Sequence, residues 1–137
     1  MTKGTITVTS ADAEKLRNLL REAIATDYRS SPYLTHLRGE LDRARIVEPH
    51  QIEMDVVTMH STVVLRDLES GETSTWMLVF PEEADLETGK LSVLAPIGTA
   101  VLGYRAGDMF TWDTPSGACS MRVEKVLFQP EAASREG

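Results

Sequence analysis

The spacing of apolar residues changes once along this chain, and that change limits the folds open to it. Up to about residue 44, apolar residues recur at intervals of three and four, which is the period of an α-helix. From Val56 onward this period disappears, and short runs rich in β-branched residues alternate with turn residues. The sequence therefore predicts an α+β protein in which a helical amino-terminal part precedes a β-rich body.

Two helices are expected in the amino-terminal part. The first begins after Thr9 or Ser10, either of which can cap it, and runs to about Ala25, whereas the second begins at Pro32. Their connection, residues 26–31, is short enough to favour antiparallel neighbours, so we predict a helical hairpin with a coiled-coil-like seam. Packing of both helices on a common core is the alternative. The apolar stripes are Ala13, Leu16, Leu20 and Ala23, and Leu34, Leu37, Leu41 and Ala44.

The body is expected to be an antiparallel sheet. Turn residues at 69–71 and 115–117 are typical of hairpin tips. Pro49 disfavours helix before it, so residues 1–49 are predicted to form the hairpin domain and residues 50–137 the sheet domain. A further short strand is expected at residues 5–9, with an unknown partner. The predicted strands of the body are residues 56–59, 62–68, 73–80, 90–94, 109–114 and 118–128.

The last predicted strand changes phase along its length. Cys119, Met121 and Val123 share one parity, whereas Val126 and Phe128 take the other. A one-residue shift moves side chains to the other face of a sheet, so we predict a β-bulge or a change of face around residues 124–125. Burial of both faces beyond that point is the alternative. The tail from residue 132 is expected to be mobile.

Residues 91–103 (LSVLAPIGTAVLG) read as strand, helix and turn. Pro96 suits the first turn of a helix, where a missing N–H is tolerated, and Ile97 and Val101 recur at helical spacing. Gly103 is well placed to end this helix in the left-handed conformation. Gly98 is interpreted as a helix-packing residue. One short helix is therefore predicted in the body.

The body resembles a known family. Residues 91–103 strongly resemble the carboxy-terminal domain of the bacterial Gre transcript-cleavage factors, and so do residues 61–68 (STVVLRDL), 71–73 (GET) and 78–85 (LVFPEEAD). Residues 54–59 (MDVVTM) and 129–133 (QPEAA) are more specifically similar to the Rnk group, short Gre relatives known as regulators of nucleoside diphosphate kinase. The resemblance covers nearly the whole chain and implies an FK506-binding-protein-like fold for the body.

The resemblance also implies a partner. Gre factors insert their helical hairpin into the secondary channel of RNA polymerase, where acidic residues at its tip help to hold a catalytic magnesium ion. The corresponding tip here is Asp27, Tyr28 and Arg29, in which only Asp27 is acidic. A helix of about 15 residues is also only about 22 Å long. The paired acidic tip is missing, so we expect binding without stimulation of transcript cleavage.

The Gre carboxy-terminal domain docks through the loop before its short helix. The resemblance therefore implies that RNA polymerase, at the secondary-channel rim of its β′ subunit, is contacted by Leu94, Ala95, Pro96 and Ile97, with Gly98 beside them. Ala95 departs from the family pattern, because Gre factors commonly have a polar residue there. In the alternative interpretation, Pro96 and Ile97 only begin the helix and fill the core.

The chain carries no enzyme motif. His36, His50 and His60 have no metal-ligand spacing, Cys119 is the only cysteine, and neither a nucleophile elbow nor a phosphate loop occurs. We therefore expect no catalysis, no metal and no cofactor. The fold resemblance raises one alternative, a prolyl isomerase or peptide-binding module. Its pocket would be built from Trp76, Phe80, Tyr104, Phe110, Trp112 and Phe128, which on alternating strands are more often core residues.

Charge is divided unevenly along the chain. Residues 1–50 hold eight Lys or Arg against seven Asp or Glu, a net charge of +1, whereas residues 51–137 hold six against fourteen, a net charge of −8. An acidic module favours a basic protein surface over nucleic acid, so direct nucleic-acid binding is not expected. No apolar run is typical of a membrane span or signal peptide, which predicts a cytoplasmic protein, and we expect a monomer.

Overall fold

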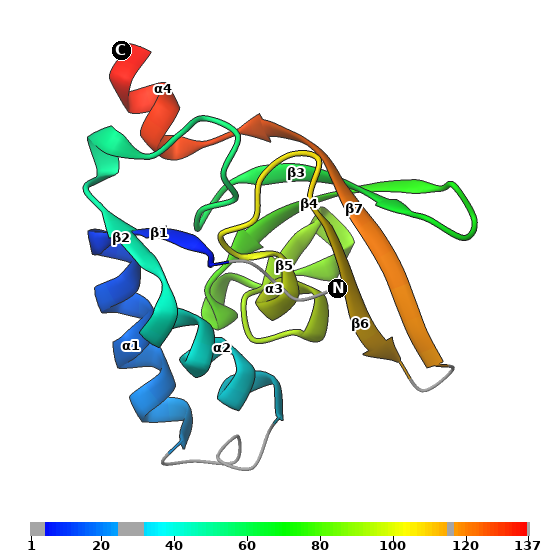
Figure 1. Ribbon diagram of the computed structural model, residues 1–137, viewed down its shortest axis with the longest axis horizontal. Coiled ribbons are helices and arrows are strands. Elements are labelled where there is room, and N and C mark those ends of the chain that lie inside the picture. The colour runs from blue at the N-terminus through cyan, green and yellow to red at the C-terminus, as the bar shows by residue number, and fades with distance from the viewer. Residues whose placement is uncertain (1–4, 25–31, 115–116, 137) are drawn as a thin grey trace.

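Two helices lie against a five-stranded sheet, with a two-stranded sheet beside them (Figure 1). The computed structural model describes residues 5–24, 32–114 and 117–136. The helices are α1 (Ser10–Ile24), α2 (Pro32–Arg43), α3 (Pro96–Val101) and α4 (Pro130–Glu136), with short 3-10 helices η1 (Pro49–Gln51), η2 (Pro81–Glu83) and η3 (Leu86–Thr88). The strands are β1 (Thr7–Thr9), β2 (Arg45–Val47), β3 (Thr62–Asp67), β4 (Thr73–Val79), β5 (Lys90–Ser92), β6 (Met109–Thr114) and β7 (Gly117–Phe128).

The two predicted helices are present, but they do not form an isolated seam, and the connection between them lies outside the described residues. Thr9 caps α1, because its hydroxyl accepts the Asp12 N–H at 3.1 Å. Leu16 and Leu37 are fully buried in one apolar cluster that also contains Leu65 of β3. The alternative, in which both helices pack on a common core, is therefore the one observed. Each stripe covers only about three turns, which is marginal for an isolated hairpin, and its buried residues belong to the same cluster as those of the body. The division at residue 49 stays a prediction, and one continuous core spans both parts.

Strand β1 has a partner that the sequence did not indicate. It pairs in parallel with β2, with Thr7 opposite Arg45, and the Arg45 N–H donates to the Ile6 carbonyl at 2.9 Å. Gly103 joins this small sheet to the body: its N–H donates to Val57 and its carbonyl accepts the Thr7 N–H at 3.4 Å. Gly103 has φ +79°, and a Cβ there would lie 2.5 Å from the Ile6 Cβ. The predicted helix-ending glycine is thus also a packing position.

The large sheet has the order β5-β4-β3-β7-β6. All its pairs are antiparallel except β4 and β5, which are parallel, so the prediction of an antiparallel sheet is wrong at β5. Residues 80–89 carry the chain back along β4, so that β5 can run parallel to it. The Met77 N–H of β4 donates to the Gly89 carbonyl, just before β5, at 2.7 Å. The predicted hairpin between β3 and β4 is confirmed, with Gly71 at φ +78° in its turn. Residues 115–116 of the second predicted tip lie outside the described residues.

The phase change in β7 is a β-bulge, as predicted. Val123 pairs with Leu65 and Lys125 pairs with Val64, so Glu124 has no opposite residue on β3. The Glu124 carboxylate accepts hydrogen bonds from the Nε atoms of Arg122 at 2.7 Å and Arg66 at 3.0 Å. These bonds hold the pKa of Glu124 below its usual range. The bulge therefore orients a carboxylate between two arginines.

One other prediction about the body is wrong, and one helix was not predicted. Residues 56–59 do not form a strand, because Val56 makes only an isolated β-bridge to Arg105. Residues 58–61 form a turn instead, in which the Thr58 N–H donates to the Ser61 Oγ at 2.9 Å. Residues 132–136 of the tail belong to α4, a second helix of the body, and the mobility of the tail stays a prediction. The buried side chain of Gln129 anchors α4, because its Nε2 donates to the carbonyls of Glu53 at 2.7 Å and Val56 at 2.8 Å.

Candidate functional site

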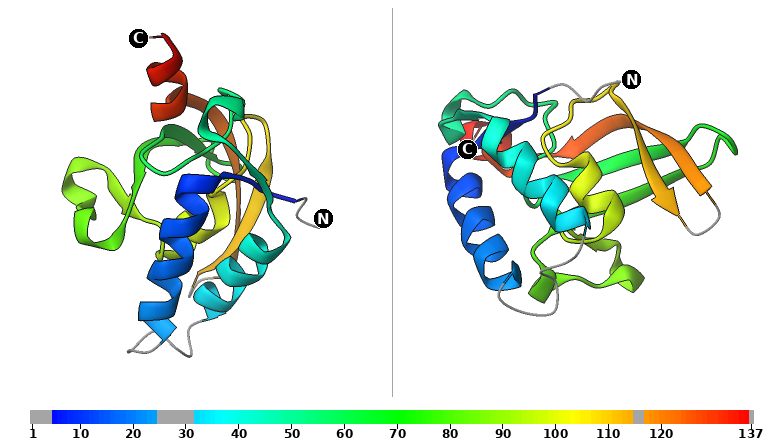
Figure 2. Two further views of the ribbon diagram at one scale, coloured as in Figure 1. Left: turned by 90° about the vertical axis from the view of Figure 1, so that its left-hand side faces the viewer. Right: turned by 60° about the horizontal axis from the view of Figure 1, so that its bottom comes forward.

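The segment between β5 and α3 is organised by the last residue of β5, Ser92. The Leu94 N–H donates to Ser92 Oγ at 3.0 Å, and the Ala95 N–H donates to the Ser92 carbonyl at 3.0 Å. Ala95 is extended, with φ −71° and ψ 153°, and Pro96 takes the first position of α3. The predicted strand, helix and turn are therefore confirmed. The right-hand view of Figure 2 shows α3 beside α2, with which it is in contact.

Because Gly98 has no side chain, α3 can lie close to β5, the strand before it. A Cβ at Gly98 would lie 2.1 Å from the Ser92 carbonyl oxygen and 3.0 Å from the Val93 Cα. No side chain fits there, which confirms Gly98 as a packing residue. Gly98 is buried, so a partner at this segment would touch the half-buried residues before it, which are Leu94, Ala95, Pro96 and Ile97. Leu94 and Ile97 also pack against the core. The role of these residues in binding stays a prediction.

Strand β5 is an edge strand, and η2 and η3 pack beside it. Leu86 of η3 is 67% exposed, more than any other large apolar side chain among the described residues. Sequence reasoning missed Leu86, although an apolar residue inside an otherwise polar turn was a usable signal. The same segment exposes Glu82, Glu83, Asp85 and Glu87, with Lys90 as the nearest base in sequence. This edge therefore combines apolar residues with excess negative charge, which favours a basic partner surface.

His60 fixes the position of η2. Its backbone is left-handed, with φ 67°, and its Nε2 lies 2.8 Å from the Glu83 Oε1. Its ring meets the ring of Phe80 edge-on, with 5.8 Å between the centroids. The hydrogen bond from His60 holds the pKa of Glu83 below its usual range. The acidic segment is thus attached to the start of β3.

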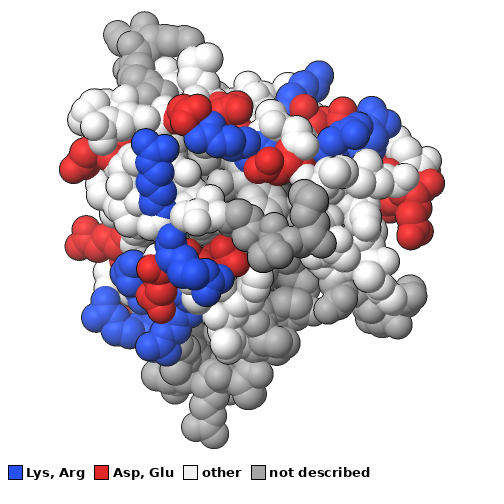
Figure 3. Space-filling view, viewed as in Figure 1, with Lys and Arg blue, Asp and Glu red and all other residues white. Residues whose placement is uncertain are grey.

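The predicted hairpin tip, Asp27, Tyr28 and Arg29, lies outside the described residues. The helices that lead to it are α1 with 15 residues and α2 with 12 residues. Helices of these lengths extend about 22 Å and about 18 Å at 1.5 Å per residue. On the face shown in Figure 3, charges of both signs are interspersed, with Lys and Arg gathered over the hairpin at the lower left.

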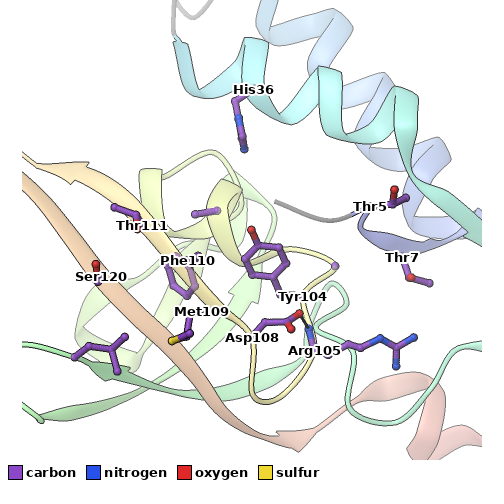
Figure 4. A pocket seen from close by; sticks show the side chains of 13 residues that line it. Thr5, Thr7, His36, Tyr104, Arg105, Asp108, Met109, Phe110, Thr111 and Ser120 are labelled. Carbon is purple, nitrogen blue, oxygen red and sulfur yellow. Dashed lines mark hydrogen bonds between the residues drawn. The ribbon is translucent and has the colours of Figure 1, made fainter. Parts of the chain in front are cut away.

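A hollow of about 470 Å³ lies beside edge strand β6 (Figure 4). Of the aromatic set predicted for peptide binding, only Tyr104 and Phe110 line it, with ring centroids 5.9 Å apart. Burial raises the pKa of the Tyr104 hydroxyl above its usual value. Trp76, Phe80 and Trp112 instead pack against the core, and Phe128 is 47% exposed at the end of β7. The aromatic set does not converge on this hollow, which removes the basis for a prolyl-isomerase pocket.

Across residues 5–24, 32–114 and 117–136, no three His, Cys, Asp or Glu side chains lie together in a way that could hold a metal ion. Within those same ranges, no helix combines the length and apolar character that crossing a membrane requires.

The chain matches known proteins along its whole length. Residues 43–128 match the family model "Transcription elongation factor, GreA/GreB, C-term", and residues 5–47 match "Rnk N-terminus". It is 40% identical to "Regulator of nucleoside diphosphate kinase" of Escherichia coli K12 over 97% of this chain and 96% of that protein. It is 31% identical to "Transcription elongation factor GreA" of Nitratidesulfovibrio vulgaris, over 70% of this chain and 60% of that factor.

A solved structure agrees with these matches. It is the "Prokaryotic transcription elongation factor GreA/GreB from Nitrosomonas europaea", which superposes with a TM-score of 0.76 and 38% identity. The superposition covers 92% of this chain and all of that one. The relatives are named as regulators and transcription factors rather than enzymes. With its Rnk-type amino-terminal segment and its Gre-type body, the chain belongs to the GreA/GreB family of transcription elongation factors.

Proposed function

We propose that this protein binds RNA polymerase at the β′ rim of the secondary channel and regulates transcription by occupying a position that Gre factors also use. The main support for this proposal is the structure of residues 94–97 in a chain that belongs to the GreA/GreB family. This segment is half-buried, fixed by Ser92 and Gly98, and set beside an edge with excess negative charge. A rigid apolar contact with a charged rim is typical of protein interfaces.

Occupancy without transcript cleavage is the second half of the proposal. The tip sequence holds one carboxylate, Asp27, and so lacks the paired acidic residues that the Gre resemblance implies for holding a catalytic magnesium ion. The helices of the hairpin have 15 and 12 residues, and the chain matches only 60% of the GreA relative's length. A short hairpin with one tip carboxylate favours a protein that competes with Gre factors for RNA polymerase over one that stimulates transcript cleavage.

Substitution of Pro96 tests the binding surface. We expect Pro96→Asp to weaken binding to bacterial core RNA polymerase about tenfold, the effect of losing one well-packed interface residue. An aspartate suits the first turn of α3, so the fold should persist. Ile97→Ala should weaken binding by a similar factor. Dissociation constants are measured by biolayer interferometry, and thermal melting checks that each variant is folded.

Met109→Ala is the matched control, because Met109 is 50% exposed on β6, at the opposite edge of the sheet. It should bind polymerase as tightly as the unchanged protein. If Pro96→Asp and Ile97→Ala bind normally while folded, residues 94–97 are not the contact, and the proposed surface is wrong.

A further inference from the structure

The turn formed by residues 58–61 holds together helices from opposite ends of the chain. The Met59 N–H donates to Oδ2 of Asp12, on α1, at 3.1 Å. The Thr58 hydroxyl donates to Oε1 of Glu131, on α4, at 2.7 Å. Two carboxylates that are 119 positions apart therefore bind adjacent residues of one turn.

Asp12 is poorly solvated for a carboxylate, because its side chain lies in the first turn of α1 and the residue is only 8% exposed. Burial, together with the negative charge of Glu131, raises the pKa of Asp12 to about 6 in spite of the hydrogen bond from Met59. Lys15 and His60 lower the pKa of Asp12 by smaller amounts. Asp12 thus changes charge close to neutral pH.

A hollow of about 500 Å³ separates α1 from α4 at this place. Both carboxylates line it, and the other charged or titratable groups that face it are Lys15 of α1, His50 of η1 and His60 of the turn. Helix α4 is otherwise held here by the side-chain amide of Gln129. Helix α4 also contacts η1 beside this hollow. Because Asp12 and Glu131 line the same hollow, the charge of Asp12 can influence how firmly α4 is held.

We propose that Asp12 and Glu131 form a pH-sensitive latch, in which uptake of a proton by Asp12 holds α4 more tightly against the turn. When both carboxylates are ionised they repel each other across the hollow. When Asp12 is neutral the repulsion disappears, while Glu131 still accepts the Thr58 hydroxyl. Docking of α4 therefore strengthens as the pH falls from 7.5 to 5. This latch is independent of residues 94–97 and of the proposed function.

Hydrogen exchange of the Ala133 amide in the full chain tests the latch, because this N–H donates to the Gln129 carbonyl in the first turn of α4. After correction for the intrinsic pH dependence of exchange, protection should rise about two- to fivefold between pH 7.5 and pH 5, the effect of one partly exposed charge pair. In Asp12→Asn the protection should be equal at the two pH values. Glu131→Gln keeps an acceptor for Thr58 and should also abolish the difference.

Histidines titrate in the same range, so they supply the matched controls. His50→Gln and His60→Asn should retain the rise in protection, and asparagine tolerates the left-handed backbone of residue 60. The latch is wrong if the unchanged protein shows equal protection at both pH values. It is equally wrong if the rise persists in both Asp12→Asn and Glu131→Gln, or if only the histidine variants remove it.

Discussion

Gly98→Ala is expected to lower the free energy of unfolding by about 3 kcal/mol, the upper range for overpacking a buried site. The added Cβ would lie 2.1 Å from the Ser92 carbonyl oxygen and 3.0 Å from the Ser92 carbonyl carbon. These are backbone atoms of a segment that cannot yield freely, because the next residue, Val93, donates its N–H to Val79 of β4 at 2.9 Å. Relief of the clash must displace either α3 or the end of β5. Urea denaturation followed by circular dichroism measures the loss.

Gly39→Ala makes the same chemical change in α2 and is the control. The nearest atoms to a Cβ at Gly39 belong to the flexible guanidinium of Arg43, at 3.4 Å. Alanine is favoured over glycine inside a helix, so the free energy of unfolding of this variant should be about 0.5–1 kcal/mol higher than that of the unchanged protein. We therefore expect Gly98→Ala to lower the free energy of unfolding and Gly39→Ala to raise it. A Gly98→Ala protein as stable as the unchanged one would show that α3 does not pack on Ser92 as described.

Asp12→Asn is expected to raise the free energy of unfolding at pH 7 by about 2–3 kcal/mol, since one pKa unit corresponds to about 1.4 kcal/mol. The pKa of Asp12 is raised from 3.8 to about 6 by burial, so the folded state binds this proton more tightly than the unfolded state. The resulting stabilisation is complete below pH 3.8 and is lost as the pH rises through about 6. Asparagine stays neutral throughout, and its Oδ1 can accept the Met59 N–H.

The gain from Asp12→Asn should therefore be largest at pH 7 and should shrink toward pH 4, as urea denaturation at several pH values will measure. Asp42→Asn is the control, because the Asp42 side chain is 60% exposed on α2 and its ion pair with Arg17 is a long 3.4 Å contact. Surface changes of this kind alter stability by less than about 0.5 kcal/mol. A loss of stability in Asp12→Asn at pH 7 would mean that the ionised carboxylate is stabilising, contrary to its burial.

The parts of the fold that the sequence predicted correctly depend on local chemistry. Thr9 caps the helix that follows it, Pro96 begins α3, and Gly103 ends that segment in the left-handed conformation. The bulge at Glu124 was visible because side-chain parity must change when one residue is inserted into a strand. Each signal lies within a few residues of the feature that it specifies.

The missed parts depend on contacts between distant residues. The strand β2 pairs with β1, 38 positions earlier, and its three residues, Arg45–Val47, are too few to be recognised as a strand without that partner. Parallel pairing of β5 depends on the path of residues 80–89, and α4 depends on the buried amide of Gln129. The acidic residues beside Leu86 could be read from the sequence, but their position along an edge strand could not.

We propose that this protein occupies the site of Gre factors on RNA polymerase without stimulating cleavage, and this proposal can be tested directly. The most direct measurement combines two readouts on one paused transcription complex: displacement of the bound protein by a Gre factor, and release of cleaved transcript. We expect displacement by the Gre factor and, for this protein alone, cleavage no faster than in its absence. Binding that a Gre factor leaves unchanged, or cleavage accelerated by this protein, would contradict it.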